Sequence, residues 1–388
     1  MAGAAEGYGG GRLALWAANL RDRLRGAHAR ANARAGWLRP PPGRGCVLWV
    51  RAGAEPRHVR MAVELAGAIR HRRLDVRIAL TWEAEQPGLA EARLAGLRRL
   101  AWGYGPADAP AAVRRALRRL GPMGVVAVGG VRPRLGRALA GRDVRLAVAG
   151  GPPAGGERPA LVWPFDADEA EAWTAAGTAG RVLAPADPLT LLVLAQAEPT
   201  LRALAGGGER PLWWAHGLAP AEAAAFVAAW RASPTGAGLL WLSPQEPGAA
   251  EALAAALPDA ARVSAWERTP LPAGAVMVVD DPRWLGALAA SAEAVHLASA
   301  GSEAAWQALA GGAAVSAAAA ARAACPALAP SAARALDAPE AVLAWWAEAL
   351  AAPGWRRRHG DPARRAFWAA RRAAEANLET LLATVYEW

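Results

Sequence analysis

Short apolar runs alternate with longer segments of helical periodicity along most of this chain. Residues 47–50 are apolar throughout, and after the turn that follows them Met61, Leu65, Ala68 and Ile69 recur at helical spacing. A short, uninterrupted apolar run is typical of a strand buried on both faces, whereas the later spacing is typical of a helix packed on a sheet. We therefore predict a strand, a turn and a helix over residues 46–71.

The same alternation continues on both sides of a glycine-rich stretch, residues 206–208. Strict alternation of strand and helix predicts a parallel sheet covered by helices on both faces. Before the stretch we expect strands at 76–80, 125–128, 144–149, 161–163 and 182–183, and helices from 89 and at 110–120, 135–139 and 166–175. After it we expect strands at 212–215, 239–242, 263–265, 276–279, 295–298 and 313–316, and helices at 220–232, 249–257, 284–290, 303–309 and 362–386.

The domain organisation follows from this restart of the pattern. A chain of 388 residues is long enough for two domains, and a run of glycines at 206–208 is a flexible joint. We expect an α/β fold with two Rossmann-like domains that face a cleft. The first 38 residues would hold a disordered Gly-rich tail and a basic amphipathic helix. The N-terminal domain would span 39–206 and the C-terminal domain 209–350, and a helix in 361–388 would return to the N-terminal domain.

The amphipathic helix is expected at residues 12–25. Leu13, Trp16, Leu20 and Leu24 form one apolar stripe, with arginines around the rest of the helix. Such a helix can lie in a membrane interface, or it can be an ordinary first helix that packs on its own domain. Both interpretations remain open on the sequence alone. No segment has the apolar length of a membrane-spanning helix, and the N-terminus lacks the pattern of a signal peptide.

Composition changes this picture in three ways. Much of the 54% hydrophobic fraction is alanine, so the 19 tryptophans must supply a large share of the core. The formal net charge of +10 suggests nucleic acid, an anionic membrane surface or a phosphorylated ligand as partners, but the sequence has no basic runs interleaved with aromatics, which argues against nucleic acid. Cys46 and Cys325 lie in apolar surroundings, which favours buried free thiols and a reducing cytoplasm. No His or Cys cluster predicts a metal site.

Glu55 is the leading candidate for chemistry. Gly53 permits the turn after the first predicted strand and Pro56 suits a first helical position, so Glu55 falls at the carboxyl end of the strand, where the helix starts. Open α/β sheets bind their ligands at that end. The carboxylate can merely cap the helix, or it can act as a general base that takes a proton from a substrate hydroxyl.

An ordered series of short strings resembles the bacterial transferases of 3-deoxy-D-manno-octulosonic acid (Kdo). Residues 49–55, Trp-Val-Arg-Ala-Gly-Ala-Glu, are a shortened form of the family's W-x-H-A-x-S-x-G-E, whose catalytic glutamate falls on Glu55. Residues 79–88 resemble its T-T-x-T-x-x-G strand end, and residues 104–115 are close to its P-x-D-x-P-x-x-V-x-R-F segment. The similarity extends over most of residues 12–350.

The sequence departs from the family's pattern where that pattern carries chemistry. Residues 128–133 keep the proline of E-x-E-L-W-P but lose both carboxylates, and residues 244–249 lack the arginines of P-R-H-P-E-R. The donor-binding carboxylates of D-T-M-G-E-L and G-G-H-N-x-x-E are replaced by Trp284 and Trp306.

The resemblance implies an inverting transfer in which Glu55 deprotonates a sugar hydroxyl, the oxygen attacks the anomeric carbon of Kdo, and CMP leaves. It implies that the acceptor is bound by Arg51, Gly53, Arg57 and His58, and that the donor is bound by Asp280, Asp281, Ser299, Gly301, Ser302 and Glu303. The helix start after Gly301 can hold a phosphate on free N–H groups. Ser302 and Glu303 can equally be mere caps of that helix, and the two aspartates can be caps of the helix after Pro282.

The implied function is transfer of Kdo from CMP-Kdo to a lipid A precursor in lipopolysaccharide core synthesis, without a cofactor. The protein would attach peripherally to the anionic cytoplasmic face of the inner membrane. A catalytically inactive paralogue that binds or scaffolds is one alternative, which the lost donor motifs favour and Glu55 disfavours. A transferase of the same fold that uses another nucleotide sugar is the second.

Overall fold

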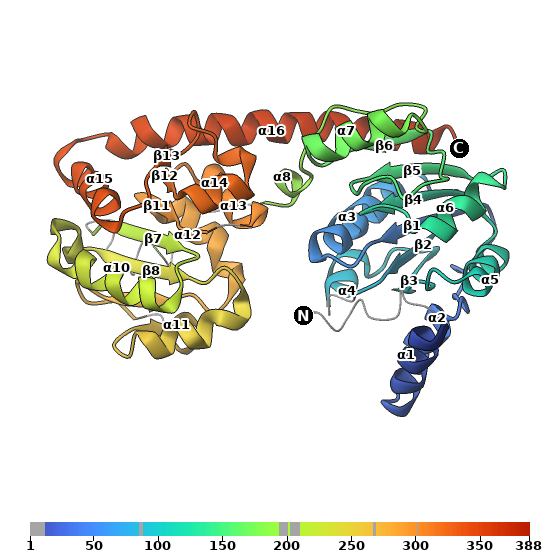
Figure 1. The fold of residues 1–388 in the computed structure, drawn as a ribbon, viewed down its shortest axis with the longest axis horizontal. Helices are drawn as coiled ribbons and strands as arrows, with labels where there is room; N and C mark the ends of the chain where they lie inside the picture. The colour runs from blue at the N-terminus through green and yellow to red at the C-terminus, as the bar shows by residue number, and fades with distance from the viewer. Residues whose placement is uncertain (1–11, 85–87, 194–200, 202–209, 267–268, 300) are drawn as a thin grey trace. The chain divides into compact units, whose positions relative to one another are not determined.

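The computed structural model describes residues 12–84, 88–193, 201, 210–266, 269–299 and 301–388 (Figure 1). Contacts along the chain divide it into two compact units. Unit 1 comprises Met1–Pro188 with Arg372–Trp388, and unit 2 comprises Leu189–Arg371. The predicted joint at 206–208 and the predicted disordered tail lie outside the described residues.

Unit 1 has a parallel sheet whose described strands are β1 (Val47–Ala52), β2 (Arg77–Trp82), β3 (Leu100–Tyr104), β4 (Pro122–Val128), β5 (Arg145–Ala149) and β6 (Leu161–Trp163). Their order is β3-β2-β1-β4-β5-β6. The chain winds in one direction from β1 to β3 and in the other from β4 to β6. The carboxyl ends of β1 and β4 therefore form the point where the order reverses, and doubly wound sheets bind ligands there.

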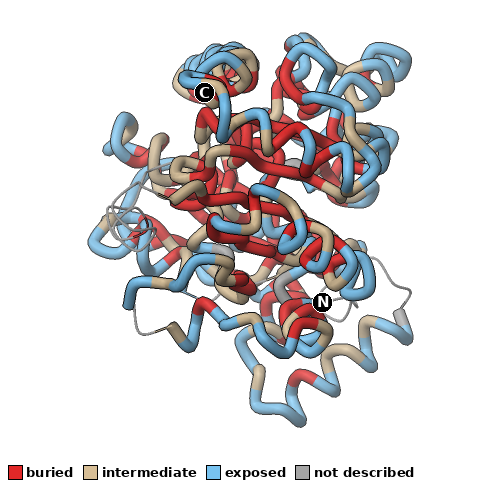
Figure 2. The backbone as a smooth tube through the Cα atoms, turned by 90° about the vertical axis from the view of Figure 1, so that its left-hand side faces the viewer, coloured by how far each residue is buried: buried red, intermediate tan, exposed pale blue. Residues whose placement is uncertain are grey.

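Helices cover both faces of this sheet. They are α1 (Arg12–Leu24), α2 (His28–Arg34), α3 (Pro56–Arg72), α4 (Leu89–Leu94), α5 (Pro110–Leu120), α6 (Pro133–Ala140) and α7 (Ala167–Ala176). Figure 1 shows α3 on one side of the strands and α5 and α6 on the other. On the second side Trp49 of β1 packs with Leu117 of α5 and Leu135 of α6. With both faces covered, every residue of β1 is buried. Figure 2 shows buried segments, in red, with exposed segments, in pale blue, around them.

Unit 2 has a second parallel sheet, formed by β7 (Leu212–His216), β8 (Leu239–Ser243), β9 (Ala261–Arg262), β10 (Val276–Val278), β11 (Ala294–Leu297), β12 (Ala314–Ala317) and β13 (Arg334–Ala335). The order is β13-β12-β11-β7-β8-β10-β9, which reverses between β7 and β11. Its helices are α8 (Leu189–Leu192), α10 (Pro220–Ala232), α11 (Ala250–Ala256), α12 (Leu285–Ser291), α13 (Ser302–Gly311), α14 (Ala319–Ala324) and α15 (Pro339–Ala351). Short 3-10 helices are η1 (Pro234–Ala237), η2 (Pro247–Ala249), η3 (Val263–Ala265), η4 (Pro282–Trp284) and η5 (Pro326–Leu328).

The last helix, α16 (Trp355–Tyr386), contributes to both units. It begins before the predicted start at residue 362, and Pro362 lies inside it. Within unit 1, Asn377 donates a hydrogen bond to the Ala184 carbonyl oxygen over 2.8 Å, and Glu379 pairs with Arg72.

Tryptophan fills much of both cores, as the composition predicts. Nine of the largest fully buried side chains are tryptophans. In unit 2, Trp213 and Trp346 stack with their rings 5.2 Å apart and 8° from parallel. Trp306 is 7% exposed and lies in the core, and Trp284 packs against the same core. These two indoles therefore pack in the core at positions where the Kdo transferase motifs have carboxylates.

Several predicted elements are wrong or were not foreseen. Residues 263–265 are η3 and not a strand, because the carboxylate of Asp280 binds the Ser264 backbone N–H and stabilises a turn. Residues 182–183 contribute only an isolated bridge from Val182 to Val162. Strand β3 was missed because it is an edge strand, partly exposed and broken by Gly103, so it lacks a continuous apolar run.

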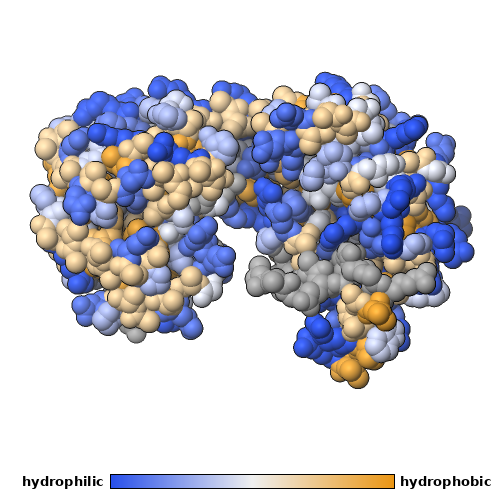
Figure 3. All heavy atoms as spheres, in the orientation of Figure 1, coloured by the Kyte–Doolittle hydropathy of each residue, from blue (hydrophilic) through white to orange (hydrophobic). Residues whose placement is uncertain are grey.

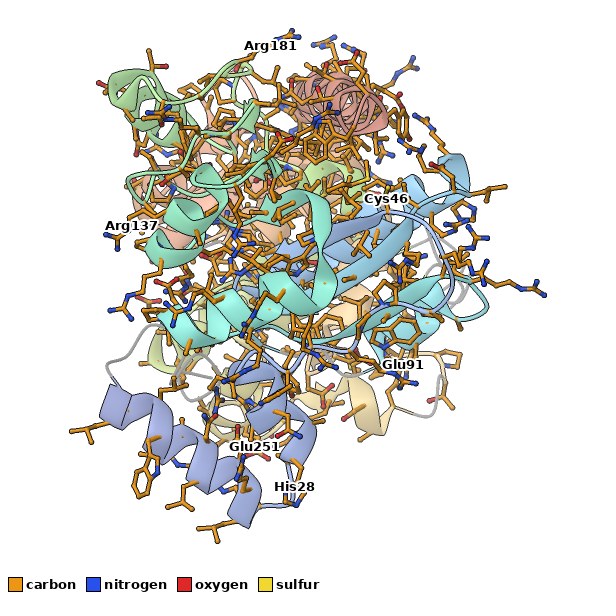
Figure 4. The ribbon with its side chains drawn as sticks, turned by 90° about the vertical axis from the view of Figure 1, so that its right-hand side faces the viewer. His28, Cys46, Glu91, Arg137, Arg181 and Glu251 are labelled. Atoms are coloured by element: carbon orange, nitrogen blue, oxygen red, sulfur yellow. The ribbon has the colours of Figure 1, made fainter. Side chains whose placement is uncertain are left out.

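The prediction that both thiols are buried is wrong for Cys46. Cys325 is buried, but Cys46 is exposed, because it precedes β1 and stands outside the covered part of the sheet. Figure 4 labels its side chain.

The described residues of unit 1 leave the apolar stripe of α1 exposed. Leu13 is 83% exposed, Trp16 65% and Leu24 80%. Figure 3 shows strongly hydrophobic and strongly hydrophilic side chains next to one another on this helix. The helix is held from its other side, where the buried Asp22 pairs with Arg34 of α2 over 2.8 Å. None of the described helices combines the length and hydropathy needed to cross a bilayer.

Candidate functional site

Three strand ends of unit 1 meet at a cavity of about 360 Å³. Its walls come from the residues that follow β1, β2 and β4, and from the loop after β5. The lining comprises Arg51, Gly53, Ala54, Glu55, His58, Glu83, residues 129–133 and residues 152–154. The cavity therefore lies at the reversal point of the sheet, and it contains four of the five residues predicted for catalysis and acceptor binding.

A buried ionic cluster forms the floor of this cavity. Glu83, 1% exposed, accepts hydrogen bonds from Arg51 and from Arg132, whose Nε lies 3.0 Å from Glu83 Oε1. Arg51 also donates to the Gly130 carbonyl oxygen over 3.2 Å. Burial by itself raises the pKa of Glu83, but the two guanidinium groups outweigh it, so this pKa lies below its usual value. Two cations share one anion, so this cluster carries a net charge of +1, and the Glu55 carboxylate lies in the same cavity.

Glu55 occupies the N-cap position of α3 but does not cap the helix with its side chain. Its carboxylate is 56% exposed and accepts a hydrogen bond from Arg57 Nε over 2.7 Å. The carboxylate of Glu55 therefore pairs with Arg57 and does not have the helix-capping role that the sequence allowed. Arg57 is placed beside the cavity by this ion pair and does not line it.

His58 lies against the glycines of the cavity wall. Its Nε2 is 3.8 Å from Glu55 Oε2, and its Nδ1 has no hydrogen-bond partner among the described residues. A Cβ atom at Gly129 would come within 2.2 Å of Nδ1, and Gly129 also has a φ of +80°, so only glycine fits there. Burial lowers the pKa of His58 to about 4, and the Glu55 carboxylate opposes this only in part. His58 is therefore neutral at pH 7.

The predicted donor residues are distributed around two cavities of unit 2. Asp280, Gly301 and Glu303 line one of about 160 Å³, and Ser299 lines one of about 770 Å³. Ser299 Oγ lies 2.9 Å from both the Gly217 carbonyl oxygen and Gln245 Oε1. Gly301 is the N-cap of α13, and Ser302 is its first residue.

Both aspartates bind the backbone of the chain itself. Asp280 accepts from Ser264 N over 2.9 Å, so it stabilises η3 and not the helix that follows Pro282. Asp281 accepts from Arg283 N over 3.0 Å and pairs with the Arg283 side chain, whose hydrogen bond lowers the pKa of this carboxyl. Asp281 therefore caps the helix after Pro282, as the sequence allowed. Asp280 also has a capping role, but it caps η3 instead.

His216 lines the smaller cavity and was not singled out from the sequence. Ser243 Oγ accepts from Trp214 Nε1 over 2.7 Å and lies 2.8 Å from His216 Nδ1. His216 Nδ1 is the only acceptor within hydrogen-bond distance of the Ser243 hydroxyl among the described residues, so the hydroxyl proton is assigned to Nδ1 and the imidazole proton to Nε2. Burial lowers the pKa of His216 to about 4, so a neutral ring presents an N–H donor to this cavity. Among the described residues, no group of three or more His, Cys, Asp or Glu side chains is placed to hold a metal.

Solved structures resemble most of the chain. A glycosyltransferase from Rickettsia africae is 10% identical, covering 89% of this chain and 98% of its own, with a TM-score of 0.56. The UDP-GlcNAc 2-epimerase of Neisseria meningitidis, bound to UDP-GlcNAc, is 11% identical over 87% and 99%, with a TM-score of 0.52. HepE from Anabaena, in complex with UDP-glucose, is 12% identical over 89% and 100%, with a TM-score of 0.53. The fold is of the glycosyltransferase-B (GT-B) type.

At these identities the likeness establishes the GT-B fold and no activity. No protein-family model and no curated protein sequence matches the chain. Within the GT-B fold, sequence reasoning missed Glu83, Arg132 and His216. Glu83 had a usable signal, because it is a carboxylate that follows the strand predicted at 76–80 by three residues, at the sheet edge where Glu55 lies. His216 had a similar signal, because it directly follows the strand predicted at 212–215, whereas Arg132 is recognisable only through its partner Glu83.

Proposed function

We propose that this protein is a glycosyltransferase in which Glu55 is the general base. The unit 1 cavity carries the proposal, because it combines an exposed carboxylate at the carboxyl end of β1 with a fixed cationic cluster. An acceptor anion that binds the guanidinium groups of Arg51 and Arg132 would present a neighbouring hydroxyl to Glu55. General-base assistance of this kind is worth roughly 10²–10⁴-fold in rate.

The proposed donor is CMP-Kdo and the proposed acceptor a lipid A precursor, in lipopolysaccharide biosynthesis. The strings at residues 49–55, 79–88 and 104–115 support this choice, and no cofactor is needed because CMP-Kdo is a substrate. One GT-B neighbour was solved with UDP-GlcNAc and another with UDP-glucose. These complexes support a nucleotide sugar as the general class of the donor. In unit 2 the Nε2–H of His216, beside the start of α13, suits a phosphate oxygen or a carbonyl of the donor.

Peripheral attachment to an anionic inner-membrane surface belongs to the same proposal. The apolar stripe of α1, with Trp16 and three leucines, is exposed in the part of the chain that the structure describes, and Arg21 and Arg23 lie in the last turn of this helix. An amphipathic helix of this kind buries its apolar face at the boundary between headgroups and acyl chains. The acceptor of the proposed reaction lies in such a membrane.

A catalytically inactive binding protein is the second candidate. Among the described residues that line the two unit 2 cavities, none is an arginine. Trp284 and Trp306 are used in packing, and Asp280 is used to hold η3. A nucleotide-sugar phosphate would therefore depend on backbone N–H groups and His216 for its charge.

Calorimetric titration separates these candidates. We expect CMP-Kdo to bind, His216→Phe to weaken its binding, and His58→Phe in unit 1 to leave it unchanged. If UDP-glucose binds and CMP-Kdo does not, the transferase proposal stands and the donor assignment is wrong. If neither binds, the inactive alternative is the better account.

A further inference from the structure

The larger cavity of unit 2 lies at the carboxyl ends of β7, β8, β11 and β12 and has a volume of about 770 Å³, ample for a sugar-sized ligand. Its polar lining includes the carboxylates of Glu222, Glu246 and Asp337 and the imidazole of His296. The chain has 44 basic residues, yet none of the described residues that line this cavity is basic. The local charge is therefore opposite in sign to that of the protein as a whole.

The helix N-termini at this cavity are already occupied by carboxylates. Glu222 accepts a hydrogen bond from Ala219 N over 3.0 Å at the start of α10. Asp337 accepts from Ala319 N over 2.6 Å at the start of α14. Free N–H groups at helix starts ordinarily attract phosphate, but here side chains of the protein take that place. The negative charge of these carboxylates disfavours an anionic ligand at this cavity.

His296 adds a further acceptor to this lining. The ring is 3% exposed and lies 4° from parallel with the Phe226 ring, with their centroids 6.2 Å apart. Ser316 Oγ lies 3.3 Å from the Val295 carbonyl oxygen and 3.2 Å from His296 Nδ1. When the Ser316 hydroxyl donates to the carbonyl oxygen, it accepts from Nδ1, and each of the three groups then has a partner. Burial lowers the pKa of His296 to about 4, which leaves the ring neutral at pH 7. Nε2 then carries a lone pair and has no hydrogen-bond partner among the described residues.

We propose that this cavity binds a ligand rich in hydrogen-bond donors, of the amino-sugar class, and rejects phosphate. Hydroxyl and ammonium groups of the ligand would be matched by the Nε2 lone pair of His296 and by carboxylates. Glu246 is the carboxylate free for this role, because its side chain is exposed and makes no hydrogen bond to a described residue. Charge-assisted hydrogen bonds are roughly twice as strong as neutral ones, so an ammonium group strengthens binding.

Nitrogen-15 NMR of histidine-labelled protein tests the premise directly. The His296 signals, identified by their loss in His296→Phe, should show a protonated Nδ1 and an unprotonated Nε2 at neutral pH. Glucosamine should shift the Nε2 signal, glucose should shift it only at higher concentration, and glucose 6-phosphate should not shift it. A protonated Nε2 in the free protein would overturn the proposal, as would no shift with glucosamine or an equal shift with glucose 6-phosphate.

Two carboxylate variants then test the charge. Glu246→Gln should weaken glucosamine binding by about threefold to tenfold. A tenfold change in affinity corresponds to about 1.4 kcal/mol, and one exposed ion pair contributes up to about that much. Glu251→Gln is the matched control, because Glu251, labelled in Figure 4, is a nearby carboxylate on α11 that does not line the cavity. Equal affinities in the parent and Glu246→Gln would refute the role of Glu246. None of these probes requires glycosyl transfer, so a negative result would leave the proposed function standing.

Discussion

Acidification should destabilise unit 2 through its two buried histidines. His216 and His296 are each 3% exposed, and burial lowers the pKa of both from 6.5 to about 4. Between these two pH values the unfolded chain binds a proton that the folded chain does not, so lowering the pH favours unfolding. The loss of stability begins as the pH falls below about 6.5 and is complete near pH 4.

The magnitude follows from the size of the pKa shift. One pH unit corresponds to about 1.36 kcal/mol per proton, and pH 5 lies about 1.5 units below the unfolded-state pKa of histidine. Each histidine should therefore lower the free energy of unfolding by about 2 kcal/mol at pH 5, and the pair by about 4 kcal/mol. Total stabilities of domains are typically about 5–15 kcal/mol, so this loss is large.

Urea unfolding at about pH 7.5 and about pH 5, followed by tryptophan fluorescence, measures the effect. His216→Asn and His296→Asn should each reduce the difference between the two free energies of unfolding by about 2 kcal/mol, whatever they do to stability itself. Trp214→Phe is the control, because it removes the donor to Ser243 without removing a titratable group, and its pH dependence should equal that of the parent. If the free energy of unfolding of both histidine variants depends on pH as strongly as that of the parent, the reasoning is refuted.

Three further predictions concern unit 1. Glu83→Gln leaves the buried Arg51 without its anion and should cost about 3–5 kcal/mol in urea unfolding, whereas Asp75→Asn, at an exposed pair with Arg73, should cost less than about 1 kcal/mol. Gly129→Ala should destabilise the protein by at least about 1 kcal/mol, because its Cβ would meet His58 at a positive φ, and an unchanged melting temperature would contradict this. Trp16→Ser should weaken binding to phosphatidylglycerol vesicles by about tenfold. Leu74→Ser, at an exposed site outside α1, should leave that binding unchanged. Equal effects of the two substitutions would show that α1 is not the attachment site.

The fold was largely predictable because its central strands are buried on both faces. The apolar run of β1 and the proline at the start of α3 marked one strand–turn–helix unit without ambiguity. Edge elements were harder, since β3 and β9 are partly exposed and need no continuous apolar run. Residues 263–265 form a 3-10 helix in which Ser264 N donates a hydrogen bond to the Asp280 carboxylate, and no local pattern encodes that bond.

The candidate site was predictable only where a single strand end carries it. Arg51, Gly53, Glu55 and His58 lie in one continuous segment from the end of β1 to the start of α3, so their common cavity followed from the sequence. The cluster around Glu83 could be predicted only with the strand order in hand. Glu83 follows β2, Arg51 lies near the end of β1 and Arg132 follows β4, and these strands are neighbours only in the folded sheet. The states of His216 and His296 depend on serines from adjacent strands, which only the register reveals.

Glycosyl transfer by the parent and by Glu55→Gln tests the central claim most directly. The measurement is single-turnover transfer from CMP-Kdo to a lipid A precursor in detergent micelles, detected by mass spectrometry, with Glu64→Gln on the same helix as the control. We predict transfer by the parent and the control, and a rate roughly 10²-fold or more lower in Glu55→Gln with donor binding little changed, because the substitution keeps the shape and removes the basicity. Equal rates in Glu55→Gln and the parent, or a parent that binds the donor and transfers nothing, would contradict the assignment of Glu55 as the general base of a glycosyltransferase.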